Sequence, residues 1–186
     1  LEALLPMNQY QAMVNRAWTQ RWKPEAVDRE ITAARTATAD LEAAIAAAET
    51  ERTTNVSGTA YEAITDELGR GFVVSLLGDA DTLCESDVLA CVSSDDPLTV
   101  HFDARDYGLP YMTDWLRTGI AYHEFAHVLQ FANPKLTERA LEAFGGDYEA
   151  HADCFALTFL DGWTLDHTIW VSSFEYYEVS MGYGYT

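Results

Sequence analysis

A repeat of small and apolar residues in the first third of the chain predicts one long helix. From residue 27 to residue 48 these residues recur at alternating spacings of four and three, which is typical of a helix with one continuous apolar face. The repeat consists of Val27, Ile31, Ala34, Thr38, Leu41, Ile45 and Ala48. A helix over residues 24–52 is roughly 42 Å long at the usual rise of ~1.5 Å per residue. Because the repeat consists largely of small residues, a partner helix can approach it closely.

The partner of this helix is predicted to come from the same chain. Residues 1–22 are moderately apolar and predicted to be helical, and folded back they would cover the repeat. A coiled-coil dimer of two chains is the alternative; we expect the hairpin and therefore a monomer. The segment 53–58 (Thr-Thr-Asn-Val-Ser-Gly) interrupts the helical pattern. We therefore predict an N-terminal helical hairpin over residues 1–55 and a second domain over residues 56–186.

The second domain is predicted to be of the α+β class, with a small sheet followed by helices. Gly69 ends the first short helix, and Thr113 or Asp114 caps the longest one. The predicted helices cover residues 61–68, 114–131, 137–144 and 147–160. The predicted strands cover residues 72–77, 88–93 and 98–102. The aromatic segment 163–186 carries no clear pattern of either kind.

The charge of the chain excludes several classes of partner. Thirty acidic residues against eleven lysines and arginines give a net charge of −19. Such a charge repels phosphate groups, so we expect no binding to nucleic acid or to anionic membranes. No stretch without charges approaches the ~18 residues of a membrane span, and the hydrophobic share of 48% is that of a globular domain. The acidic field instead favours cationic peptides and metal ions.

The three cysteines bear on the cellular location. Cys84 and Cys91 are close enough in sequence to form a disulfide, and two unpaired buried thiols are the alternative. Cys154 lies within an apolar helical pattern and is predicted to be a buried free thiol. A disulfide indicates an extracytoplasmic or secreted protein. No signal-peptide pattern opens the chain, so we expect any targeting sequence to be removed or to lie outside it.

The sequence His123-Glu124-Phe125-Ala126-His127 lies within the longest predicted helix of the second domain. Histidines four positions apart lie on one helical face, so their ring nitrogens can reach the same metal ion. Glu124 is rotated by about 100° from His123, where its carboxylate can reach a metal-bound water without binding the metal itself. A solitary histidine in such a helix is usually a core residue. A pair beside a glutamate favours a metal site.

Two carboxylates on the following helix complete this candidate site. Glu149 and Asp153 are also four positions apart, and both point to the same side. Catalytic zinc takes three protein ligands and keeps a fourth position for water, so Glu149 is the predicted third ligand. Asp153 can accept the free ring N–H of His123 and so orient it. Two solvated carboxylates are the alternative, which the apolar residues around them disfavour.

The motif His123-Glu124-x-x-His127 followed by Glu149-x-x-x-Asp153 resembles the gluzincin branch of the zincin metallopeptidases, in particular small bacterial neutral zinc peptidases. The likeness covers about residues 98–159. It implies a zincin-like domain, with a small twisted sheet over the HExxH helix and an edge strand that pairs with extended peptide; residues 98–102 are our candidate for that strand. It also implies one Zn²⁺ ion and peptide hydrolysis through a metal-activated water, with Glu124 as the general base.

Other residues have weaker assignments. The metzincin pattern requires glycine at 130 and histidine at 133, so Gln130 and Asn133 exclude that branch. No motif marks the group that stabilises the oxyanion; the candidates are His167, Tyr176 and Tyr177. His101 is predicted to be an ordinary strand residue. His151 points away from the face of Glu149 and Asp153 and is predicted to be non-catalytic.

Three functions remain open from the sequence. The first is an active zinc peptidase acting on a peptide or protein substrate. The second is a catalytically weak or inactive binding or regulatory protein on a zincin scaffold, in which residues 1–52 recognise a partner. The third is an inhibited precursor whose hairpin or tyrosine-rich tail lies across the cleft.

Overall fold

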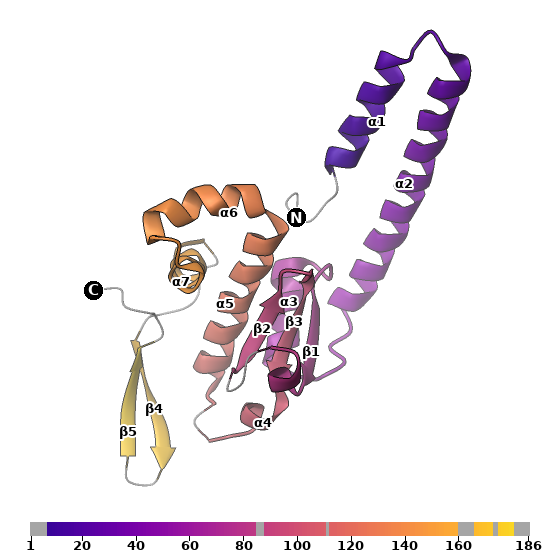
Figure 1. Ribbon diagram of the computed structural model, residues 1–186. Coiled ribbons are helices and arrows are strands. Elements are labelled where there is room, and N and C mark those ends of the chain that lie inside the picture. Colours follow the sequence, from indigo (N-terminus) through magenta and orange to yellow (C-terminus); the bar gives the residue numbers. More distant parts are fainter. Residues whose placement is uncertain (1–6, 85–87, 111, 160–165, 173–174, 181–186) are drawn as a thin grey trace.

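The computed structural model of the chain describes residues 7–84, 88–110, 112–159, 166–172 and 175–180 (Figure 1). The fold is α+β, as predicted, with a helical hairpin, a three-stranded sheet and helices packed against that sheet. The α-helices are α1 (Met7–Thr19), α2 (Pro24–Arg52), α3 (Ala60–Gly69), α4 (Ala104–Tyr107), α5 (Asp114–Ala132), α6 (Pro134–Leu141) and α7 (Tyr148–Phe159). The strands are β1 (Val74–Gly78), β2 (Ala90–Ser93), β3 (Asp96–Asp103), β4 (Asp166–Ser172) and β5 (Glu175–Ser180). Short 3₁₀ helices are η2 (Ala80–Thr82) and η3 (Glu142–Phe144).

Helices α1 and α2 form the expected hairpin within one chain, and Figure 1 shows it extending away from the sheet. The Tyr10 hydroxyl donates to the carbonyl oxygen of Ala37 at 2.8 Å. Nearer the turn, Arg16 and Glu30 form an ion pair at 3.0 Å. Because residues later in α1 contact residues earlier in α2, the two helices run antiparallel.

The inner face of α2 agrees with the predicted one only in part, since four of the seven repeat residues are buried or half-buried. Ile31, Thr38 and Ile45 belong to the repeat but are exposed, whereas Ala26 outside the repeat is buried. The periodicity was right, but the face is rotated towards Glu30, because polar contacts from α1 reach that side. When the partner helix is itself polar, a repeat of small residues in the sequence does not show which of two adjacent helix faces packs against that partner.

The hairpin meets the sheet domain at Gly71. This glycine has a φ of +75°, and a Cβ atom there would lie 1.9 Å from the carbonyl oxygen of Ala48 near the end of α2. Only glycine tolerates both conditions. Helix α3 begins after the break, with the Thr59 side chain accepting from the backbone N–H of Glu62.

The strand order of the main sheet is β1-β3-β2, with β3 parallel to β1 and antiparallel to β2. This corrects the prediction that residues 98–102 form an edge strand, since β3 lies in the centre. The physical reason is that Val100 and Phe102 of β3 are fully buried, and a strand with both edges paired holds them in the core. Within the described part of the chain, the edge strand lying against α5 is β2.

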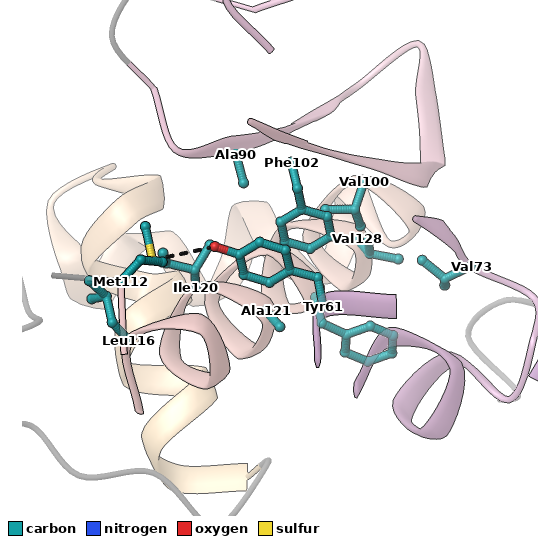
Figure 2. Close-up of a cluster of buried hydrophobic side chains, with 11 residues drawn as sticks. Tyr61, Val73, Ala90, Val100, Phe102, Met112, Leu116, Ile120, Ala121 and Val128 are labelled. Carbon is teal, nitrogen blue, oxygen red and sulfur yellow. Dashed lines mark hydrogen bonds between the residues drawn. The ribbon is translucent and has the colours of Figure 1, made fainter. Parts of the chain in front are cut away.

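The hydrophobic core lies between this sheet, α3 and α5 (Figure 2). Tyr61 of α3 stacks on Phe102 of β3 with ring centroids 4.1 Å apart. From α5, Ile120, Phe125 and Val128 enter the same cluster. Helix α5 therefore has one fixed rotation about its axis, and this rotation determines where His123 and His127 point.

The later elements agree with the sequence prediction in kind and differ in their ends. Helix α6 begins at Pro134 rather than residue 137, and its predicted last turn is the 3₁₀ helix η3. Helix α7 begins one residue after Asp147, whose Oδ1 accepts the backbone N–H groups of Glu149 and Ala150 at 3.0 Å. Strands β4 and β5 form an antiparallel hairpin that the sequence did not predict.

Cys84 and Cys91 form the predicted disulfide. A disulfide fits an extracytoplasmic protein. Cys154 is free, as predicted, but only partly buried. Among the described helices, none combines the length and the apolar character needed to cross a lipid bilayer.

Candidate metal centre

Helices α5 and α7 bring His123, His127 and Glu149 together, and this trio is close enough to hold one metal ion. The Nε2 atoms of the two histidines are 3.0 Å apart. Oε2 of Glu149 lies 3.0 Å from Nε2 of His123 and 3.3 Å from Nε2 of His127. The residues predicted as ligands from their spacing are thus brought together, although Glu149 lies 22 positions after His127 in the sequence.

The donor set fits a tetrahedral ion. Bonds of ~2.0–2.1 Å to imidazole nitrogen or carboxylate oxygen give a tetrahedron with edges of about 3.3–3.4 Å, close to the three separations in the structure. Two ring nitrogens that face each other at 3.0 Å repel unless a cation or a proton lies between them. The Glu149 side chain is 51% exposed, so one side of the trio is open to solvent.

Asp153 contacts His123 as the sequence predicted. Its Oδ1 accepts a hydrogen bond from Nδ1 of His123 at 2.7 Å, and the residue is buried. This bond directs Nε2 of His123 towards the other two ligand atoms. Burial lowers the pKa of His123, but the hydrogen bonds to Asp153 and Glu149 outweigh it and raise that pKa to about 10. The hydrogen bond from His123 is the main cause that holds the pKa of Glu149 below its usual range, and the nearby ring of His127 acts in the same direction.

Glu124 lies beside the trio without belonging to it. The residue is only 6% exposed, and its Oε2 atom is buried with no hydrogen-bond partner. Burial raises the pKa of this carboxyl group above its ordinary value. Burying a carboxylate oxygen without a hydrogen-bond partner costs free energy. Because Glu124 lies next to the candidate metal site, this oxygen is placed to accept a hydrogen bond from a molecule bound there.

Gln130 is a site residue that sequence reasoning missed. Its Oε1 lies 2.7 Å from Nδ1 of His127, and its Nε2 lies 2.7 Å from Nδ1 of His151. His151 lies outside the ligand trio, as predicted, but it is connected to it through this amide. The sequence held one indication of this role: Gln130 follows His127 by three positions, and residues with this spacing are neighbours on the surface of a helix.

The described part of the chain does not place the remaining candidates at the site. His101 lies in β3, where it pairs in register with Cys91 and Leu76. His167 lies in β4 and Tyr176 and Tyr177 in β5, but their side chains are outside the part of the structure that is described. Their suggested role with the oxyanion therefore stays a prediction.

Comparison of the chain with protein-family models, with curated proteins and with solved structures found no match in any of the three.

Proposed function

We propose that the protein is a zinc-dependent peptidase. The observation that carries this proposal is the combination of a two-histidine, one-glutamate donor set that is open on one side with a buried, unpartnered Glu124 carboxylate beside it. Three ligands with a free position distinguish catalytic zinc sites from structural ones, which are closed by four protein ligands. The resemblance of the motif to gluzincins supports the same reaction.

The chain's own residues have distinct roles in this proposal. A bound zinc ion would supply a water molecule of lowered pKa and would polarise the scissile carbonyl. His123, His127 and Glu149 bind the ion, and Asp153 orients His123. Glu124 accepts the proton from the attacking water and passes it to the leaving amine. Its raised pKa lies in the direction that a general base working near neutral pH requires.

The substrate is proposed to be an extended peptide. Strand β2 is an edge strand that contacts α5, and within the described residues its outer edge pairs with no other strand, so it is available to pair with an extended peptide. The net charge of −19 favours peptides that carry positive charge. We also propose that the protein is secreted, a location that suits its disulfide.

One observation favours the alternative of a binding or regulatory protein. The hairpin exposes Trp18 and Trp22 near its turn, at 69% and 65%. Exposed indole rings are typical of surfaces that recognise a partner. In this alternative the metal centre turns over slowly or not at all.

Removal and return of the metal tests the proposal. We expect the purified protein to cleave peptides in a mixed library, as followed by mass spectrometry, and to lose this activity after treatment with a chelator. Addition of one equivalent of zinc should restore it. A protein that retains zinc and cleaves nothing in the library would favour the binding protein instead.

Zinc affinity is expected to rise by about tenfold for each pH unit between pH 7 and pH 9. His123 with a pKa of about 10 carries a proton in this range, and zinc must displace that proton. The same proton stabilises the metal-free fold below pH 6.5, and this contribution is lost as the pH rises through 10. Calorimetric titration in two buffers of different ionisation enthalpy should show about one proton released per zinc at pH 7.5. Binding without proton release would contradict the raised pKa.

A further inference from the structure

We infer that Gln130 is a positioning residue of the metal centre: its amide holds the ring of His127 and ties it to the helix that carries Glu149. This inference rests on the metal site of the proposed function, though not on peptide hydrolysis. It concerns how the site keeps its geometry.

All the polar groups of the Gln130 side chain are used. Oε1 accepts from Nδ1 of His127 at 2.7 Å, and Nε2 donates to the carbonyl oxygen of Tyr148 at 3.0 Å and to Nδ1 of His151 at 2.7 Å. The residue is only 3% exposed, so water does not compete for these bonds. A buried amide with all three partners present is held in one orientation.

The carbonyl of Tyr148 decides which way the amide faces. A carbonyl oxygen accepts hydrogen bonds and cannot donate one, so the NH₂ group of Gln130 must point to it. The amide oxygen is then directed at His127, which must carry its proton on Nδ1. Nε2 of His127, which faces His123 and Glu149, therefore presents its lone pair to a metal ion.

The same amide links two helices. His127 lies on α5, whereas Tyr148 and His151 lie on α7, on either side of Glu149. A shift of α7 that moves Glu149 away from the histidines must therefore break the bond to Tyr148 or the bond to His151. Asp153 ties α7 to His123 in the same manner, so each ligand histidine has its own connection to this helix.

The two connections differ in charge. The connection to His123 is made by the carboxyl group of Asp153. The connection to His127 is made by the neutral amide of Gln130, which adds no charge to the buried side of the site. Replacing Gln130 with glutamate keeps the acceptor for His127 but loses the donors to Tyr148 and His151. Replacing Gln130 with leucine, whose side chain is of similar size, removes both the acceptor for His127 and the donors to Tyr148 and His151. Comparing the two variants therefore distinguishes the effect of the hydrogen bond to His127 from the effect of the hydrogen bonds that link α5 to α7.

The test measures zinc affinity by competition with a fluorescent chelator, together with the visible spectrum of the cobalt-substituted protein. We expect Gln130→Leu to bind zinc about 10–100-fold more weakly and to change the cobalt spectrum. Gln130→Glu should recover most of the affinity, to within about tenfold of the wild type. Thr137→Val is the matched control, because Thr137 is buried and donates to the Gln130 backbone at 2.9 Å without touching a ligand.

A readout without metal keeps the inference testable. In the wild-type protein with ring-labelled histidines, the Nδ1 proton of His127 should give a slowly exchanging resonance, since it is buried and hydrogen-bonded. This resonance should disappear in Gln130→Leu and persist in Thr137→Val. Thermal unfolding of each variant shows whether it is folded.

Three outcomes would overturn the inference: unchanged zinc affinity and cobalt spectrum in Gln130→Leu, an equal loss in Thr137→Val, or no protected proton at His127. A wild-type protein that binds zinc and hydrolyses no peptide would overturn the proposed function while leaving this inference standing.

Discussion

Replacement of Glu149 with alanine is expected to lower zinc affinity by more than about 100-fold, because loss of an orienting partner alone costs ~10–100-fold and Glu149 supplies a ligand atom. Its Oε2 lies within 3.3 Å of both histidine Nε2 atoms, so it closes the donor triangle. Without it, two imidazoles on one helical face remain, which is an incomplete catalytic zinc site. Equilibrium dialysis followed by metal analysis measures the change.

The control for this variant is Glu142→Ala. Glu142 is exposed in η3, so its replacement removes the same charge from the same part of the chain without reaching the centre. We expect this variant to bind zinc within about threefold of the wild type, as a single exposed charge has a small effect. Undiminished zinc binding in Glu149→Ala would show that the third ligand is another residue.

The part of the site that could be predicted from the sequence depends on helical spacing alone. His123 and His127 are four residues apart on one helix, and so are Glu149 and Asp153 on the next. Such pairs share a face whatever the surroundings. Once the two faces meet, the contacts His127–Glu149 and His123–Asp153 follow, and the structure contains both.

What could not be predicted depends on contacts between distant segments. The exposure of Ile31 and the burial of Ala26 are set by where α1 packs on α2. The central place of β3 depends on β1 and β2 pairing with both of its edges, and a single strand's pattern does not reveal its neighbours. Gln130 carries no motif; its role follows from a carbonyl 18 residues further along the chain.

The core and the candidate metal centre share helix α5. Phe125 and Val128 of this helix pack under the sheet, while His123, Glu124 and His127 lie on or beside the face turned to α7. Because core residues and site residues are interleaved within residues 123–128, the packing of the core fixes the direction of the ligands. Within the described part of the chain, the N-terminal hairpin contacts the sheet domain at Gly71 and at helix α3.

Glu124→Gln is expected to reduce peptide hydrolysis by about 10²–10⁴-fold, the usual contribution of a general base, while zinc stays bound. The amide has the size of the carboxylate, so the fold around this nearly buried position should survive. It cannot take up the proton that the carboxylate accepts near neutral pH. The rate constant kcat and zinc content, measured on the same preparation, separate these two effects.

Glu138→Gln is the matched control, because Glu138 is exposed on α6 and the same atoms change there. We expect its kcat to equal that of the wild type within a factor of about two, since an exposed carboxylate outside the site has little influence on the reaction. If Glu124→Gln lost zinc together with activity, Glu124 would belong to the ligands or their support. If it kept full activity, the buried, unpartnered carboxylate would have no part in the chemistry, and the centre would have to be regarded as a metal-binding site without a base.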